Sequence, residues 1–333
     1  MMPRALKRRL VICVASLSLV AVFIPCTSSW SQSKAGLYPS DSVTVIVPFQ
    51  PGGGVDTQAR LMAPYIKKYL PNPVNVIVQN HPGAGGKVGF LKVFDARPDG
   101  YTIELVPSTV PGVLYIMGDL GRRDPHTLTY LTRTGYTPYM LVRSSRGRFK
   151  NVDEMKGREV KFGGPRGMLF QAALIAKLLD LKMAYITYDG LPEAAMAAMR
   201  GDLDVFFPVW DTGIKHVKAS EGKLIPMFVT AEVRVPESPD IPTAKEFGLE
   251  VKPEEVAVLA SGNWLVAPPG LSDDVAGILR NAVFKAVSDP ELEIQMQKAN
   301  YTTKPILSPE QTTKNANLTY GAYSKYKDLF PRQ

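Results

Sequence analysis

The sequence predicts an α/β fold of two lobes, each a sheet flanked by helices. Three observations predict it. Strand-like β-branched runs alternate with helical segments, glycine-rich turns join them, and a length of 333 residues allows two cores. The apolar fraction of 45% and the charged fraction of 21% are typical of a globular chain. The sequence contains no low-complexity linker, so we expect lobes joined by chain crossings.

Residues 1–33 have the layout of a cleaved signal peptide. Arg8 and Arg9 belong to a basic patch, an apolar run extends from Leu10 to Ile24, and small polar residues follow. The run is short for a membrane span, so an uncleaved anchor is the weaker alternative. Cys26 suggests a lipoprotein, but Ile24 and Pro25 before it do not suit lipid attachment. We therefore expect export from the cytoplasm.

The charge and the cysteines exclude several classes of protein. Both cysteines, Cys13 and Cys26, lie in the leader, so the mature chain offers no disulfide, thiolate nucleophile or cysteine metal site. Four of the 39 basic residues also lie there. The mature net charge is then about +4, which is too small to predict nucleic-acid binding but suits an anionic small ligand.

The mature chain is predicted to begin with strand–loop–helix units, which favour a parallel sheet with helices on its faces. The β-branched run at 42–48 is the clearest strand. Asp56 or Thr57 is expected to cap the first helix, which ends near Leu70. The remaining elements of this part are strands at 74–78 and 101–106 and a helix at 88–96.

The rest of the chain repeats this pattern and ends in helices. The expected strands are 139–142, 160–163, 184–188, 205–209, 224–229 and 264–267, and the expected helices are 169–179, 191–199, 273–287, 290–298 and 309–329. Crossings are expected near residues 106–107 and 230–231. They divide the chain into a first lobe of residues 37–106 plus 231–333 and a second lobe of residues 107–230.

Two glycine-rich loops, 48–56 and 80–86, each join a predicted strand to a helix. Glycine lets the backbone approach a ligand closely, and free N–H groups at a helix start favour an anion. Either loop alone could be a plain turn. Two at matching strand ends predict a carboxylate pocket lined by backbone. Nucleotide-binding spacings fail, because Lys87 is followed by Val88.

The sequence predicts no catalytic residues, no metal site and no cofactor. The histidines at 81, 126 and 216 are far apart and lack metal-ligand spacing. No Gly-x-Ser-x-Gly elbow occurs. Asp202 and Asp204 could act as an acid–base pair, but a solvated turn is the preferred interpretation.

Several segments, taken in order and spacing, resemble the Bug receptors, the extracytoplasmic solute receptors of tripartite tricarboxylate transporters. Pro48–Asp56 matches their Pro-Phe-x-Pro-Gly-Gly-x-x-Asp loop, and Asn80–Gly86 resembles their second loop, with His81 where Arg is usual. The resemblance covers essentially the whole mature chain, and its further segments are 98–102, 229–243, 246–248, 267–270 and 288–291.

This resemblance implies a periplasmic, two-lobed flytrap of the type II binding-protein class. Such a receptor is expected to act as a monomer without catalysis and to deliver a small organic carboxylate to membrane permease subunits. The resemblance also implies which residues bind the ligand. In the first lobe they are Phe49, Gly53, Gly54, Val55, Asp56, Ala84 and Gly85, with Ser108 and Thr109 at the lobe crossing.

The second lobe departs from the family pattern. The usual Ser-x-Gly-x-Gly-Thr stretch reads Gly163–Met168 here, and Gln171 takes the place of a histidine. Arg166 either clamps a second carboxylate or is a surface arginine. Met168, Phe170 and Trp210 either line an apolar wall or belong to the core. The ligand-binding residues expected in this lobe are Gly164, Arg166, Gly167, Gln171 and Asp211.

Two other functions stay open at this point. A sensor would pass ligand occupancy to a signalling protein instead of a transporter. An enzyme on the flytrap fold would need a reactive histidine, cysteine or metal cluster between the lobes.

Overall fold

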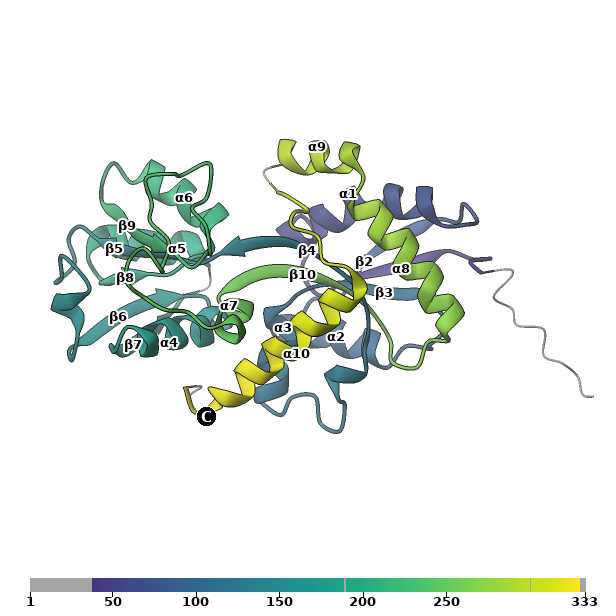
Figure 1. The fold of residues 1–333 in the computed structure, drawn as a ribbon, viewed down its shortest axis with the longest axis horizontal. Coiled ribbons are helices and arrows are strands. Elements are labelled where there is room, and N and C mark those ends of the chain that lie inside the picture. Colours follow the sequence, from purple (N-terminus) through teal and green to yellow (C-terminus); the bar gives the residue numbers. More distant parts are fainter. Residues whose placement is uncertain (1–37, 189, 300, 330–333) are drawn as a thin grey trace, which may run out of the picture. The chain divides into compact units, whose positions relative to one another are not determined.

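The computed structural model describes residues 38–188, 190–299 and 301–329, and within this part the chain forms two five-stranded sheets flanked by helices (Figure 1). The predicted fold class is confirmed. The expected signal peptide, with Cys13 and Cys26, lies outside the described residues. No helix of the described part is long and apolar enough to cross a membrane.

The first sheet has the strand order β2-β1-β3-β10-β4. Strand β1 runs parallel to both β2 and β3, whereas β10 is antiparallel to β3 and β4. The strands are β1 (Val43–Val47), β2 (Val76–Asn80), β3 (Thr102–Pro107), β4 (Thr129–Pro138) and β10 (Ala260–Ala267).

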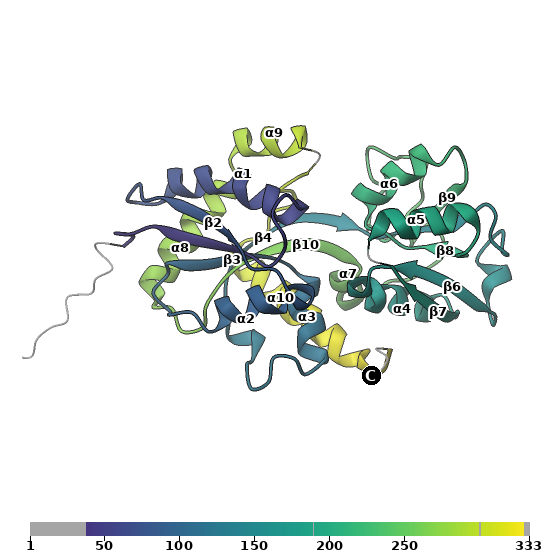
Figure 2. The same ribbon diagram turned by 180° about the vertical axis from the view of Figure 1, so that it is seen from behind.

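Helices cover both faces of this sheet, and the two opposite views agree on their arrangement (Figures 1 and 2). On one face lie α1 (Gly54–Tyr69), α8 (Asp273–Val287) and α9 (Pro290–Lys298), whose apolar residues form one core with the sheet. On the other face lie α2 (Lys87–Phe94), α3 (Thr109–Ile116) and α10 (Pro309–Lys325), which pack around the buried Trp264.

The second sheet has the order β7-β6-β8-β5-β9. Strand β6 is parallel to β7 and β8. Strand β5 is antiparallel to β8 and β9. Its strands are β5 (Met140–Ser144), β6 (Glu159–Gly164), β7 (Lys182–Thr187), β8 (Val205–Phe206) and β9 (Leu224–Val229). The helices of this part are α4 (Leu169–Leu178), α5 (Leu191–Arg200) and α6 (Trp210–Ala219). Helix α7 (Pro253–Val258) packs against α10 and β10.

Short 3-10 turns complete the described chain. The turns η2 (Ala84–Gly86) and η5 (Arg166–Met168) precede α2 and α4, and the others are Pro125–Thr127, Asp153–Met155 and Lys327–Leu329.

The passage between the sheets differs from the sequence prediction. Because β4 pairs with β10 along most of its length, residues 129–138 belong to the first sheet and not to a lobe that begins at residue 107. The chain enters the second sheet at Tyr139, whose N–H donates to the Leu259 carbonyl at 3.4 Å. Tyr139 also forms an isolated bridge with Val209. The connection is therefore a pair of antiparallel segments.

Helices α8, α9 and α10 have side-chain N-caps, whereas α1 does not have the N-cap that the sequence predicted. Ser272 and Ser308 cap α8 and α10 through their hydroxyl groups, and Asp289 caps α9. The predicted cap of α1 by Asp56 or Thr57 is wrong, because α1 begins earlier and its N-cap is Gly53. The patterns also missed β4, α3, α6 and α7.

Candidate functional site

A cavity of about 1000 Å³ is lined by segments that belong to both sheets. One wall comes from the first turn of α1 and the ends of β4 and β10, and the other from the start of α6 and the loop after β9. Its lining includes Gly54, Val55, Gln58, 134–138, 209–211, 233–237, 261–263, Gln297, Tyr301 and Thr302. A cavity of this size can hold a small organic ligand together with water.

The N-terminus of α1 faces this cavity. Helix α1 begins at Gly54, and its N-cap, Gly53, has no side chain to satisfy the first N–H groups. These groups have no partner within a helix, and the aligned dipoles of the 16 residues place partial positive charge at this end. Gly54 and Val55 line the cavity. Their backbone can therefore bind an anionic group.

The loops that follow β1, β2 and β3 touch one another. A Cβ atom added to Gly86, which has φ +100°, would lie 3.1 Å from Val110 Cγ1 and 3.6 Å from Phe49 Cζ. The carboxyl ends of parallel strands meet at one edge of a sheet, so this contact follows from the order β2-β1-β3. Ala84 and Gly85 are exposed in this region, with φ values of 46° and 65°. Both lie outside the lining of the large cavity.

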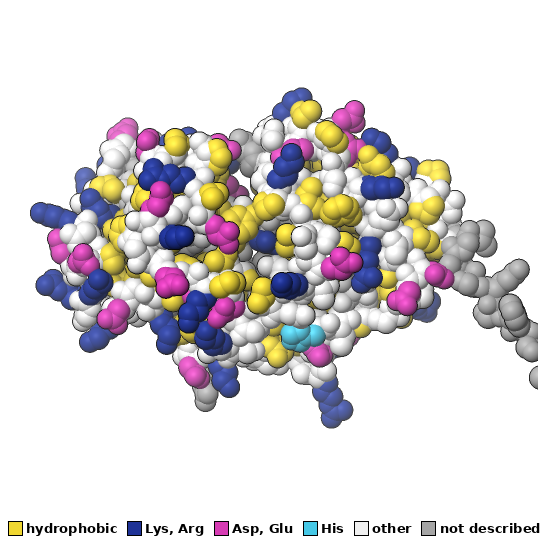
Figure 3. Space-filling view, viewed as in Figure 1, with side chains coloured by type: hydrophobic (Ala, Val, Ile, Leu, Met, Phe, Trp, Pro, Cys, Tyr) yellow, Lys and Arg dark blue, Asp and Glu magenta, His cyan; other side chains and the backbone are white. Residues whose placement is uncertain are grey.

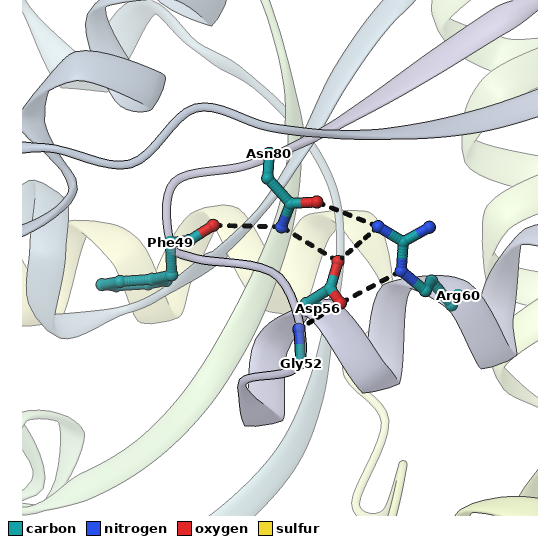
Figure 4. Close-up of polar contacts among 5 residues, drawn as sticks. All are labelled: Phe49, Gly52, Asp56, Arg60 and Asn80. Carbon is teal, nitrogen blue, oxygen red and sulfur yellow. Dashed lines mark hydrogen bonds and ion pairs between the residues drawn. The ribbon is translucent and has the colours of Figure 1, made fainter.

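Asp56 lies at the centre of a network of internal hydrogen bonds (Figure 4). Its Oδ2 accepts hydrogen bonds from Gly52 N at 2.8 Å and Arg60 Nε at 3.0 Å. Its Oδ1 accepts from Asn80 Nδ2 at 2.9 Å and lies 2.9 Å from Arg60 Nη2. Asn80 Nδ2 also donates to the Phe49 carbonyl at 3.0 Å. The network fixes the first glycine loop between β2 and α1.

The Asp56 carboxylate is charged and buried, with 3% of the side chain exposed. Burial favours its neutral form, but hydrogen bonds from Arg60, Gly52 and Asn80 and the charge of Arg60 outweigh burial and hold its pKa below the ordinary value. Both oxygens have internal partners. Asp56 also lies outside the cavity lining. Its hydrogen bonds therefore hold the glycine loop in place.

Residues 58–315 match the family described as "Tripartite tricarboxylate transporter family receptor". The chain belongs to this receptor family. It is 27% identical over 310 residues to protein BugT of Bordetella pertussis, which covers 89% of this chain and 91% of BugT. The family predicted from the sequence motifs is confirmed.

Solved structures share the fold. A TctC solute-binding protein from Polaromonas has a TM-score of 0.71 and 24% identity, covering 88% of this chain and 98% of that one. MatC from Rhodopseudomonas palustris, solved with bound malate, has a TM-score of 0.64 and 23% identity, covering 88% and 99%. At these identities the likeness shows the fold of the receptor.

In this receptor, Ser108 and Thr109 lie at the start of α3, directly after β3. Ser108 is buried, and its N–H donates to the Gly262 carbonyl at 2.8 Å. Gly262 lines the cavity, so this hydrogen bond continues the β3–β10 pairing up to the cavity wall. The hydroxyl-bearing loop predicted from the resemblance therefore lies next to the strand pair β4–β10.

The residues predicted from the second lobe are spread over two helix starts. Gly164 ends β6, where an added Cβ atom would lie 2.9 Å from the Tyr185 hydroxyl, and Arg166 and Gly167 form η5. Asp211 lies in the first turn of α6 and lines the cavity. Its Oδ1 accepts a hydrogen bond from its neighbour Thr212 N at 2.6 Å.

Gln171 and Phe170 belong to the interior of the receptor. Gln171 is fully buried, and its Nε2 donates to the Tyr323 hydroxyl at 2.8 Å, which joins α4 to α10. The Phe170 ring stacks on Tyr323 with a centroid distance of 4.2 Å, and Met168 packs against the same core. Of the three residues considered for an apolar wall, Trp210 alone is among the cavity-lining residues.

Sequence patterns missed several cavity residues of the receptor. Gln58 and Asn263 form a hydrogen bond of 3.0 Å across α1 and β10, and both line the cavity. Thr134 and Tyr136 reach it from β4. The enrichment of residues 129–137 in Thr and Tyr is a strand signal that could have identified β4.

The charges around the cavity nearly balance. The basic residues of its lining are Lys215, Lys218 and Arg234, and the acidic ones include Asp211 and Glu237. On the face shown in Figure 3, basic and acidic side chains are interspersed, so no single-signed patch dominates there. Among the described residues, no group of three or more His, Cys, Asp or Glu side chains is placed to hold a metal ion.

Proposed function

We propose that this receptor captures a small organic carboxylate outside the cytoplasmic membrane and delivers it to the membrane subunits of a tripartite transporter. In this proposal residues 1–33 direct export to the periplasm and are removed. The mature protein acts as a monomer, catalyses no reaction, and needs neither metal nor cofactor. Family membership supports the receptor role.

The observation that carries the carboxylate assignment is the first turn of α1 in the cavity wall. Gly54 and Val55 offer backbone N–H groups at the positive end of a long helix, with no side-chain cap to compete for the ligand. The Asp56 network supports the proposal, because it pairs the nearby carboxylate with Arg60. MatC, which shares the fold, was solved with malate.

We also propose that the cavity closes by movement about the paired crossing segments. Tyr139 and Leu259 are the residues through which the chain passes between the sheets. In this proposal residues 38–138 and 260–329 form one lobe and residues 140–258 the other. A ligand held by Gly54 on one side and Trp210 on the other would favour the closed state.

A thermal-shift screen of the leaderless protein tests the carboxylate assignment. The panel contains mono-, di- and tricarboxylates, including malate, adipate and citrate, together with their amides, neutral sugars and amino acids. A ligand at a hundred times its dissociation constant stabilises the protein by about 2.7 kcal/mol, which raises the melting temperature measurably. Shifts with carboxylates but not amides are expected. Shifts confined to neutral solutes would refute the assignment.

A further inference from the structure

Arg133 carries a buried positive charge that has no counter-charge among the described residues. It lies on β4 with 4% of its surface exposed, and its Nε has no hydrogen-bond partner in the described structure. Within the described residues, its guanidinium forms no ion pair with a carboxylate, and its Cζ lies 5.5 Å from the centroid of the Tyr136 ring. An unpaired buried charge is costly to a folded protein.

The charge persists at neutral pH. Burial lowers the pKa of Arg133 to about 10, and the neighbouring Tyr136 opposes this shift. Burial also raises the pKa of Tyr136 to about 12, so that its hydroxyl stays neutral and cannot act as the counter-charge. The Tyr136 ring stabilises the cation by a cation–π contact without neutralising it.

The guanidinium lies directly behind the cavity wall. A Cβ atom added to Gly262 would lie 2.5 Å from Arg133 Nε, 2.8 Å from Arg133 Nη2 and 2.7 Å from the Gly135 carbonyl oxygen. Gly135, Tyr136 and Gly262 all line the cavity. The missing side chain of Gly262 therefore leaves room for the guanidinium at the wall.

Three further polar groups of the cavity lining have no hydrogen-bond partner among the described residues. The Thr134 Oγ1, the Tyr136 hydroxyl and the Trp210 Nε1 are buried, and within the described residues none of these atoms forms a hydrogen bond. All three residues line the cavity. Buried polar groups in folded proteins are normally satisfied, so these unsatisfied groups in the cavity wall indicate a place for a polar or anionic ligand group.

This wall is continuous with the first turn of α1. A Cβ atom added to Gly54 would lie 3.2 Å from the Tyr301 hydroxyl, and one added to Gly135 would lie 3.4 Å from the Thr302 carbonyl oxygen. Tyr301 and Thr302 are neighbours in the cavity wall. A small ligand can therefore extend along these residues from Gly54 to the Arg133 region.

We propose that Arg133 is the counter-charge for a second carboxylate of the ligand, held at the wall of Gly135, Tyr136 and Gly262. This inference rests on the proposed function, which assigns the first carboxylate to the α1 N-terminus. Charge-assisted hydrogen bonds from a planar guanidinium suit a carboxylate in a water-poor site. The ligand would thereby neutralise the buried cation.

Titration calorimetry with Arg133→Met tests the inference. The probes are malate, adipate and the monoamide of whichever of these two binds the wild-type protein more tightly. The dicarboxylate should bind the variant about ten- to a hundredfold more weakly, whereas affinity for the monoamide should change little. Arg133→Lys should keep part of the preference, because it retains the charge but loses the planar fork.

Stability of the ligand-free protein gives an independent readout and shows that the variant folds. Removing an unpaired buried charge should leave the melting temperature of Arg133→Met equal to or above that of the wild type. A matched control is Arg280→Met on α8, whose Nε donates to the Tyr130 carbonyl and which lies outside the cavity lining. The control should bind the dicarboxylate like the wild type.

The outcomes separate this inference from the proposed function. If the wild-type protein binds the dicarboxylate and Arg133→Met keeps both the affinity and the preference over the monoamide, the assignment of Arg133 is wrong and the receptor function stands. If the wild-type protein binds no carboxylate of the thermal-shift panel, the proposed function and this inference fall together.

Discussion

Asn80 Nδ2 donates a hydrogen bond to Asp56 Oδ1 at 2.9 Å and thereby ties the end of β2 to the first turn of α1. The same amide donates to the Phe49 carbonyl, so one side chain holds both ends of the first glycine loop. The shape of the loop at the α1 N-terminus therefore depends on a carboxylate that the ligand does not need to touch.

Asp56→Asn should lower the free energy of unfolding near neutral pH. The substitution removes the charge that accepts hydrogen bonds from Arg60, Gly52 and Asn80, and we expect a loss of about 2–3 kcal/mol. Urea unfolding followed by circular dichroism measures it. Ligand affinity should fall as well, because the glycine loop loses its brace.

The loss should depend on pH in a defined direction. The pKa of Asp56 is lower in the folded protein than its ordinary value of 3.8, so its stabilisation is present above that value and disappears as the pH falls through the lowered pKa. The wild type and the variant should then converge in acid. Asp153→Asn is the control, since Asp153 pairs with Lys156 at the surface with 86% of its side chain exposed; a surface pair contributes little. A similar loss of unfolding free energy in both variants would contradict the stabilising role of the Asp56 network.

Glu104 should affect the free energy of unfolding with the opposite pH dependence to Asp56. It lies on β3 between Ile46 and Val266, is fully buried, and neither of its carboxylate oxygens has a partner among the described residues. Burial raises its pKa well above the ordinary value of 4.5. The folded protein therefore holds a proton that the unfolded chain releases near neutral pH, so the stability contribution is full below pH 4.5 and is lost as the pH rises toward the folded pKa.

Glu104→Gln should raise the melting temperature near neutral pH and have a smaller effect in acid, because glutamine cannot ionise in the unfolded chain. Calorimetry over a pH series measures the difference. Glu250→Gln, at an exposed loop position, is the matched control and should change little at any pH. A gain for Glu104→Gln that is the same in acid and near neutrality would show that ionisation is not its cause.

The sequence predicted the elements whose signals are local. The β-branched run of β1 and the helices α8 and α9 have bounds close or equal to those predicted, because Ser272 and the Asp289–Pro290 pair mark helix starts. Strand β4 was missed, because it contains Gly135 and ends at Pro138, and its pairing with β10 joins residues more than a hundred positions apart. That error displaced the predicted crossing.

The candidate site divides in the same way. Glycine loops and a helix start can be recognised in a short stretch of sequence, and Gly54 and Val55 line the cavity. The convergence of Arg133 and Gly262 depends on two strands paired across the fold. Likewise, Gln171 was assigned to the ligand by position, but its partner is Tyr323 on a distant helix. Neither contact can be recognised from the residues next to it in the sequence.

Gly54→Ala should weaken carboxylate binding without unfolding the protein. The new methyl group would lie 3.2 Å from the Tyr301 hydroxyl and would stand at the backbone that the ligand approaches. We expect at least about a tenfold loss of affinity, the size of one lost charge-assisted hydrogen bond.

The matched control is Gly277→Ala on α8, where an added Cβ atom meets nothing within 4 Å. That variant should bind normally and gain about 0.5–1 kcal/mol of stability, as helical glycines do on replacement by alanine. If Gly54→Ala binds adipate or malate as tightly as Gly277→Ala does, the α1 N-terminus is not the carboxylate site.

Trp210 should report ligand binding through its fluorescence. The chain has three tryptophans; Trp30 lies in the predicted leader, so the leaderless protein keeps Trp210 in the cavity wall and Trp264 in the core. The Trp210 Nε1 is buried and has no hydrogen-bond partner in the described part of the chain, whereas Trp264 Nε1 donates to Asn315 Oδ1 at 3.3 Å. A ligand that gives Trp210 a hydrogen-bond acceptor, or excludes water from its ring, should change its emission.

Trp210→Phe should abolish the change caused by a carboxylate that binds, and Trp264→Phe should keep it. A signal that survives Trp210→Phe would place the ligand away from this wall, since Trp264 can then report only an effect transmitted through the core.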